Sequence, residues 1–341
     1  MPYRLRRSTL CAAALLLLAL SAVIAPRAHA EVATVRVARQ YGIGYLQMIV
    51  MEQRKLLERH AREAGAGEVA VAWTTLGDGA VVNDAMLAGR VDFVAGGLGS
   101  FATLWDRTRG TLGVKGIAAL DSIPMLLNTR NPAVRSIQDL GPADRIAIAG
   151  VKVSSQATTL QFAAAQAWGE GSWAQLDPLT VGMAHPTGMQ ALLSGGEVSA
   201  HFTAPPYQYD ELKQPGVRTI LNSFDVWGGP QTFILAWTSS RFRADNPRVY
   251  AAFLAALREA TAFIGEHPRE AAQIYVATSG DKSAAVDDVA AILARPDIRF
   301  TLTPQNVLKF VRFKARTGSV RTVPESWKDL FFPEIHGLPG S

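Results

Sequence analysis

Two serines and a glutamine follow a short apolar run near the middle of the chain. Residues 146–149 are apolar and partly β-branched, which predicts a buried strand. Ser154, Ser155 and Gln156 then precede a helical pattern that ends at Gly169. The first backbone N–H groups of a helix have no partner within the helix, and they carry a partial positive charge. The sequence therefore predicts a binding site for a small anion or for the polar group of a ligand, unless the serines serve only as the helix cap.

The order of strand, polar loop and helix recurs along the chain. Strands are predicted in one part at residues 32–38, 68–73, 91–95 and 115–120, and in another part at residues 146–149, 179–181, 199–203 and 219–221. Residues 47–63 form one predicted helix, and the chain after residue 246 is mostly helical. A strand, a helix and a second strand of the same sheet make the two strands parallel. The pattern therefore predicts an α/β fold with two lobes, each a mostly parallel sheet flanked by helices.

Two extended segments would carry the chain between these lobes. Residues 123–128 lead out of the first lobe, and residues 232–237 return to it. We expect one lobe to contain residues 31–122 and 232–341, and the other to contain residues 123–231. The loops after the strands should then face each other across a cleft, which is where open α/β sheets usually bind ligands.

The first 30 residues have the pattern of a secretory signal peptide. Basic residues come first (Arg4, Arg6 and Arg7), an apolar run follows at residues 10–25, and a small-x-small sequence ends at Ala30. The apolar run is shorter than the ~20 residues that a membrane span needs. The sequence therefore predicts export to the periplasm with cleavage after Ala30, by the Sec or the twin-arginine route.

Composition argues against several kinds of function. Without residues 1–30, which hold four arginines and no acid, the formal charge falls from +5 to +1. A nearly neutral chain without a Lys/Arg run is not expected to bind nucleic acid. The only cysteine is Cys11, so the exported chain would have no disulfide, thiol nucleophile or thiolate metal site. Neither an H-E-x-x-H nor a G-x-S-x-G motif occurs, and we predict no catalytic residue, no metal and no cofactor.

One glycine-rich segment matches a dinucleotide-binding fingerprint. Residues 97–102 (GLGSFA) fit G-x-G-x-x-A, and Asp121 lies roughly where a ribose-binding acid would be. However, the segment follows the third predicted strand rather than the first, and nicotinamide cofactors are scarce outside the cytoplasm. A plain ligand-binding loop is therefore the favoured interpretation.

Several segments in this order resemble a known family. They are VDFVAGGLGS (91–100), SIPMLLNTRNPAVRSIQDL (122–140), IAIAGVKVSSQATTLQ (146–161), MQALLSGGEVSAHFTAPPY (189–207) and SWKDLFF (326–332). Together they resemble the periplasmic substrate-binding proteins of ABC importers, in particular the nitrate/taurine/sulfonate (NitT/TauT) group. That group shares its fold with fungal thiamine-pyrimidine synthases, whose cysteine-rich active-site segment is missing here. The resemblance implies a monomeric, hinged receptor that closes on one small molecule and delivers it to the transmembrane subunits of a permease.

The resemblance also implies that the ligand meets the loops after the strands of both lobes. Mapped onto this chain, the ligand-binding residues would be Tyr41, Gly42, Ile43, Thr75, Leu76, Gly77, Gly99, Ser100, Ser122, Ser154, Ser155, Gln156, His185, Thr203, Pro205, Trp227, Gly228 and Gly229. Glycines let backbone N–H groups approach a ligand, hydroxyls donate or accept, and aromatic rings supply an apolar wall. A turn or capping role is the alternative for each of them.

The class of ligand stays open at this point. Helix starts and hydroxyls suit a sulfonate, nitrate or carboxylate, and Lys152 could add a cation. Asp78 could pair with the amine of a zwitterion such as taurine, or it could cap the following helix. The aromatic loop residues would also admit an aromatic carboxylate or a pyrimidine. The alternatives to an importer component are an exported enzyme on the same scaffold and a ligand sensor that docks on a membrane signalling protein.

Overall fold

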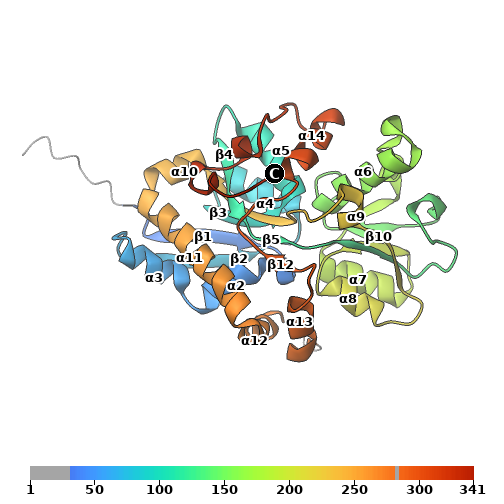
Figure 1. Ribbon diagram of the computed structural model, residues 1–341, viewed down its shortest axis with the longest axis horizontal. Coiled ribbons are helices and arrows are strands. Elements are labelled where there is room, and N and C mark those ends of the chain that lie inside the picture. The colour runs from blue at the N-terminus through green and yellow to red at the C-terminus, as the bar shows by residue number, and fades with distance from the viewer. Residues whose placement is uncertain (1–30, 281–283) are drawn as a thin grey trace, which may run out of the picture. The chain divides into compact units, whose positions relative to one another are not determined.

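The computed structural model describes residues 31–280 and 284–341 of the chain. The predicted signal peptide, residues 1–30, lies outside the described residues. Residues Val32–Ser341 form one compact unit, shown in Figure 1. Within the described ranges, no helix combines the length and apolar character that a membrane span requires.

The first sheet has five strands in the order β2-β1-β3-β11-β4. These strands are β1 (Thr34–Arg39), β2 (Ala70–Thr75), β3 (Phe93–Gly97), β4 (Val114–Ala119) and β11 (Ile234–Ser239). Strand β1 is parallel to β2 and β3, whereas β11 is antiparallel to both β3 and β4. Four strands therefore run in one direction, and β11 alone runs against them.

The second sheet has the same arrangement. Read from one edge, its order is β8-β7-β9-β6-β10, with β6 (Leu126–Thr129), β7 (Ile146–Ile148), β8 (Thr180–Gly182), β9 (Ala200–Thr203) and β10 (Arg218–Asn222). Strand β7 is parallel to β8 and β9, whereas β6 is antiparallel to β9 and β10. The reversed strand therefore has the same place in both sheets: β11 lies between β3 and β4, and β6 lies between β9 and β10. The prediction of mostly parallel sheets flanked by helices is confirmed.

Helices cover both sheets (Figure 1). They are α2 (Leu46–Gln53), α3 (Leu56–Glu63), α4 (Gly79–Leu87), α5 (Leu98–Thr108), α6 (Ser155–Trp168), α7 (His185–Ser194), α8 (Tyr207–Leu212), α9 (Ser223–Trp227), α10 (Ser240–Asp245), α11 (Pro247–Glu266), α12 (Pro268–Thr278), α13 (Val286–Leu293) and α14 (Val307–Arg316). Helix α11 buries residues at helical spacing, such as Val249, Phe253 and Leu257. The Phe253 ring stacks on Phe93 of β3 with a centroid distance of 4.0 Å, which fixes α11 against the first sheet.

The single helix predicted over residues 47–63 is wrong, because the structure has two helices there. Lys55 adopts a left-handed conformation with φ 53°, and the chain changes direction between α2 and α3. The turn has neither glycine nor proline, so no local pattern predicted it. Tertiary contacts accompany the turn: the Arg54 guanidinium lies 4.4 Å from the centre of the Phe263 ring and bonds Glu270 at 3.0 Å.

Three segments lie side by side where the chain passes between the two sheets (Figure 1). Strand β5 (Asp121–Ser122) pairs with β12 (Arg299–Phe300), and the Leu120 N–H donates to the Ile234 carbonyl at 2.9 Å. The Asp121 Oδ1 atom accepts the N–H groups of Phe233 and Ile234 at 3.3 and 3.0 Å. Asp121 is fully buried, and this desolvation raises its pKa well above the ordinary value. One carboxyl group therefore joins the segment that leaves the first sheet to the segment that returns.

Candidate functional site

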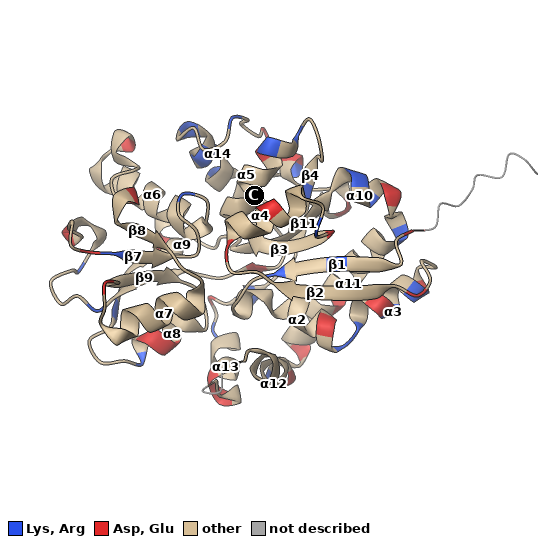
Figure 2. Ribbon diagram, turned by 180° about the vertical axis from the view of Figure 1, so that it is seen from behind, with Lys and Arg blue, Asp and Glu red and all other residues tan. Residues whose placement is uncertain are grey.

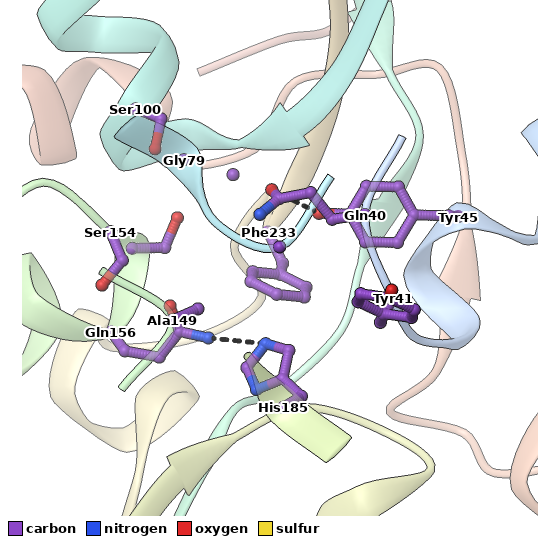
Figure 3. Close-up of a pocket in the computed structure, with 13 residues that line it drawn as sticks. Gln40, Tyr41, Tyr45, Gly79, Ser100, Ala149, Ser154, Gln156, His185 and Phe233 are labelled. Atoms are coloured by element: carbon purple, nitrogen blue, oxygen red, sulfur yellow. Dashed lines mark hydrogen bonds between the residues drawn. The ribbon is translucent and has the colours of Figure 1, made fainter. Parts of the chain in front are cut away.

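A small cavity lies where the first turns of four helices meet (Figure 3). Its volume is about 20 Å³, which is room for about one water molecule. The residues that line it are Gln40, Tyr41, Tyr45, Gly77, Gly79, Gly97, Ser100, Ala149, Ser154, Ser155, Gln156, His185 and Phe233. None of these described residues has a carboxylate, ammonium or guanidinium group. The polarity of the site therefore comes from backbone, amide, hydroxyl and imidazole groups.

Helices α4 and α5 contribute from the first sheet. Asp78 precedes α4, and its Oδ1 accepts the N–H groups of Ala80 and Val81 at 2.7 and 3.0 Å. Asp78 therefore acts as a helix cap, which is one of the two roles predicted for it. Helix α5 starts after Gly97 without a side-chain cap, because strand β3 runs directly into it. At the start of α5, the Leu98 N–H donates to the Phe233 carbonyl at 3.0 Å and the Gly99 N–H donates to Ser155 Oγ at 3.2 Å, so in this structure protein groups occupy the first two donors of the helix.

Helices α6 and α7 contribute from the second sheet. Ser154 caps α6, since its Oγ accepts the Ala157 N–H at 3.1 Å. Helix α7 starts at His185 and has no side-chain cap. Its His185 side chain lies between two polar partners: Nδ1 is 2.8 Å from Thr203 Oγ1, and Nε2 is 3.3 Å from Gln156 Nε2.

The imidazole of His185 is neutral. Burial first, and the nearby charge of His201 second, lower the pKa of His185 to about 3. His201 is itself fully buried behind the cavity, where its Nδ1 lies 2.5 Å from Glu211 Oε1. A Cβ at Gly188 of α7 would lie 2.5 Å from His201 Nε2, so only glycine lets α7 pack on this pair. His185 is therefore a neutral hydrogen-bond partner of Thr203 and Gln156, and it cannot offer a positive charge to a ligand at neutral pH.

The two sides touch across the cavity at two places. The Gly99 N–H of α5 donates to Ser155 Oγ of α6 at 3.2 Å, and the Ile43 N–H donates to the Pro205 carbonyl at 3.0 Å. A Cβ at Gly99 would lie 2.5 Å from the Ser154 carbonyl carbon, so glycine is required for this approach. The structure is therefore a closed arrangement of the two halves.

An aromatic wall and one amide complete the lining. Figure 3 shows the Phe233 ring in the middle of the lining residues, with Tyr41 and Tyr45 on one side. The Tyr45 hydroxyl donates to Gln40 Oε1 at 3.0 Å, so this bond occupies the amide oxygen of Gln40 and not its Nε2 donor. The cavity thus combines hydrogen-bond donors with apolar ring surface.

The structure brings only part of the predicted site together. Of the predicted residues, those that line the cavity are Tyr41, Gly77, Ser100, Ser154, Ser155, Gln156 and His185. A second group makes the contacts around it, namely Gly42, Ile43, Gly99, Thr203 and Pro205. The remaining predicted residues neither line the cavity nor belong to this second group, namely Thr75, Leu76, Ser122, Trp227, Gly228 and Gly229. Leu76 packs on the hydrophobic core, and Ser122 is buried in β5.

Trp227 lies in an aromatic core rather than in the cavity. Its ring stacks on Phe162 at 4.4 Å and lies 5.1 Å from Phe310, and its Nε1 donates to Thr159 Oγ1 at 3.0 Å. The sequence analysis placed Trp227 in a loop after a strand, but residues Ser223–Trp227 form α9. This helix directs the indole inward, and Gly228 ends it with φ 79°.

Six lining residues were not predicted from the sequence: Gln40, Tyr45, Gly79, Gly97, Ala149 and Phe233. Gln40 and Ala149 directly follow strands, and Gly79 and Gly97 lie at helix starts. The rule that selected their neighbours would therefore have found these four. Phe233 precedes the reversed strand β11, and only the three-dimensional arrangement places its ring in the cavity.

Solved structures with the same fold include three binding proteins. The alkanesulfonate-binding protein SsuA from Xanthomonas axonopodis pv. citri, bound to MOPS, has a TM-score of 0.65 at 18% identity, covering 87% of this chain and 96% of that one. The periplasmic aliphatic sulphonate binding protein SsuA from Escherichia coli has a TM-score of 0.65 at 18% identity, covering 89% and 92%. The periplasmic nitrate-binding protein NrtA from Synechocystis PCC 6803 has a TM-score of 0.68 at 14% identity, covering 88% and 84%. The chain matches no protein-family model, and no curated protein matches its sequence.

At these identities the similarity concerns the fold. The chain has the α/β fold of the two-lobed periplasmic binding proteins. Nitrate- and sulfonate-binding proteins are among these structural neighbours, so the resemblance inferred from the sequence is confirmed at the level of the fold.

Proposed function

We propose that this protein is the extracytoplasmic solute-binding component of an ABC importer. Its ligand would be a small anionic or zwitterionic organic molecule, for example a sulfonate such as taurine, or a small inorganic anion such as nitrate. The structural neighbours that bind sulfonates and nitrate support this ligand class. The ligand would bind between the lobes without being converted, and the chain would work as a monomer with the transmembrane subunits of a permease.

The convergence of four helix starts on a cavity without charged side chains carries this proposal. Each helix start is equivalent to roughly half a positive charge. The Asp78 carboxylate offsets this charge at α4, so the starts of α5, α6 and α7 would attract an anion, and the backbone and hydroxyl donors could bond its oxygen atoms. The Phe233, Tyr41 and Tyr45 rings would contact the apolar part of an organic ligand.

Hinge opening would admit the ligand. The cavity of about 20 Å³ is too small for a sulfonate, so opening must separate the Gly99–Ser155 and Ile43–Pro205 contacts. The contacts of α14 with α6 and α9, such as Lys314–Thr158 and Phe310–Trp227, also join the two lobes and must separate or rearrange. We place the hinge at the three segments joined by Asp121, between a lobe of residues 31–122 and 232–341 and a lobe of residues 123–231. A ligand then shifts the lobes toward closure only by the difference between its affinities for the two states.

Export supports the same function. The predicted signal peptide, with cleavage after Ala30, would place the chain in the periplasm, where a binding component of an importer acts. N-terminal sequencing of the secreted protein tests the cleavage site.

Calorimetry and thermal shift with ethanesulfonate, taurine, nitrate, benzoate and a pyrimidine test the ligand class. We expect an anion to bind and to raise the melting temperature. Gln156→Ala should weaken that binding at least about tenfold, whereas Ser194→Ala, exposed at the end of α7, should not. Binding of a neutral pyrimidine alone would refute the anion class. Chemical conversion of the bound molecule, followed by mass spectrometry, would favour the exported enzyme instead.

A further inference from the structure

A buried lysine lies beside the start of α6. Lys314 belongs to α14, which packs on both α5 and α6, and its side chain is only 1% exposed. Its Nζ lies 3.5 Å from Thr158 Oγ1, and this hydroxyl donates to the Ser154 carbonyl at 3.2 Å. The two bonds place the ammonium no more than about 7 Å from the residue that caps α6 and lines the cavity.

The charge of Lys314 has no carboxylate partner among the residues that the structure describes. Helix α6 contains no charged residue. On α5, the Asp106 carboxylate accepts the backbone N–H groups of Arg321 and Thr322, both at 2.9 Å. Buried cations are normally paired, because the loss of hydration is costly. An unpaired one beside a helix start adds its charge to that of the helix dipole.

Lys314 carries its charge at neutral pH. Burial lowers its pKa to about 8, which still leaves most molecules protonated at pH 7. The other basic residues of α14, which are Lys309, Arg312 and Arg316, are exposed, and Lys309 donates to the Trp227 carbonyl at 2.6 Å. Figure 2 shows the basic residues of α14 next to α5 and α6.

We propose that Lys314 is a specificity-determining residue that acts on the cavity from behind α6, without touching the ligand. Its ammonium raises the electrostatic potential at the Ser154–Ser155 helix start and so favours an anionic ligand over a neutral or cationic one. The inference rests on the proposed function only for the nature of the ligand. The potential itself is a property of the chain and can be measured without any ligand.

A thiol placed at the helix start measures this potential. Ser155→Cys, combined with Cys11→Ser in the full chain, gives a single thiol whose ionisation is followed by thiolate absorbance. Removal of the charge by Lys314→Met should raise the thiol pKa by about one unit, the effect of one charge roughly 10 Å away in a partly buried site. Lys314→Gln should give the same increase, because glutamine keeps a donor for Thr158 but has no charge. Lys309→Met is the matched control and should change the thiol pKa by less than about 0.3.

Two results would overturn the inference. One is a thiol pKa that is unchanged by Lys314→Met, or that Lys309→Met changes equally. The other is an increase with Lys314→Met but not with Lys314→Gln, because the hydrogen bond to Thr158 rather than the charge would then be responsible.

A separate measurement uses ethanesulfonate and nitrate as probes. If they bind the wild-type protein, Lys314→Met should weaken both about tenfold, and unchanged affinity would count against the inference. If neither binds, the anion class of the proposed function fails, and the thiol experiment still decides whether Lys314 sets the potential.

Discussion

Replacement of Lys314 by methionine should make the folded protein more stable at neutral pH. The two side chains are similar in length, but a methyl group needs no hydration. Burial lowers the pKa of Lys314 from 10.5 to about 8, and each pKa unit corresponds to about 1.36 kcal/mol. The buried charge therefore costs about 3 kcal/mol of folding free energy near pH 7. The lost bond to Thr158 offsets about 1 kcal/mol, so Lys314→Met should raise the free energy of unfolding by about 2 kcal/mol.

The same cost predicts a pH dependence with a definite sign. Between the folded pKa of about 8 and the unfolded value of 10.5, the unfolded chain holds the lysine proton more tightly than the folded chain does. The free energy of unfolding of the wild type should therefore rise with pH across this interval, and the advantage of Lys314→Met should shrink. The raised pKa values of Tyr45 and Tyr250 affect both proteins equally, so the difference between the proteins isolates Lys314.

Urea unfolding near pH 7 and near pH 9.5 measures this difference. Lys309→Met, the exposed control on the same helix, should change the free energy of unfolding by less than about 0.5 kcal/mol. The reasoning fails if Lys314→Met is less stable than the wild type near pH 7. It also fails if the difference between the two proteins is the same at both pH values, because the lysine would then not be a desolvated cation.

Four further predictions concern the cavity and its surroundings. Gly99→Ala should hold the lobes apart, because the added carbon would lie 2.5 Å from the Ser154 carbonyl carbon. Small-angle X-ray scattering should then give a larger radius of gyration than for the control Gly110→Ala, whose added carbon meets no atom within 4 Å. Equal radii for the two variants would contradict the closed contact. Because burial lowers the pKa of His185 to about 3, the affinity for a bound anion should stay constant between about pH 5 and pH 7, below the range in which Lys314 loses its proton. A tenfold loss per pH unit in this range by calorimetry would instead indicate an imidazolium. The free energy of unfolding should fall as the pH drops from 6.5 toward 3, because only the unfolded chain then gains the proton of this histidine. Trp227→Ala should lower the free energy of unfolding in urea by about 3–5 kcal/mol without changing the ligand affinity of the folded fraction. A lower ligand affinity with an unchanged free energy of unfolding would instead show that Trp227 contacts the ligand.

The fold could be predicted because its signals are local and repeated. Each short apolar run, such as residues 146–149, is followed by small polar residues and a helical pattern, and this order alone defines parallel strands. The break at Lys55 and the helix at Ser223–Trp227 were missed, because tertiary packing overrides local preference there. The identical strand order of the two sheets was also not visible, since it depends on where β6 and β11 insert.

The site could be predicted where the rule of strand ends and helix starts applies. Ser154, Ser155 and Gln156 follow a strand and line the cavity, as does His185 at the start of α7. Phe233 and Lys314 were missed for one reason. Phe233 lies just before the reversed strand β11 and Lys314 lies in α14, and both segments come far later in the chain than the loops they contact.

The separation of Lys314 from the cavity would matter for the proposed function, because a solute-binding component must release its ligand. A lysine inside the cavity would form a direct, desolvated ion pair with an anion, and breaking such a pair costs several kcal/mol. One layer of neutral groups, Thr158 and the Ser154 carbonyl, lies between the ammonium and the cavity. The charge then selects for anions through the electrostatic potential, while the groups facing the ligand remain hydrogen-bond donors that water can replace when the lobes open. Different residues would therefore determine the selectivity for anions and the release of the ligand. A variant that places a lysine in the cavity lining, such as Gln156→Lys, should bind an anion more tightly. Stopped-flow measurements should show that it releases the anion more slowly.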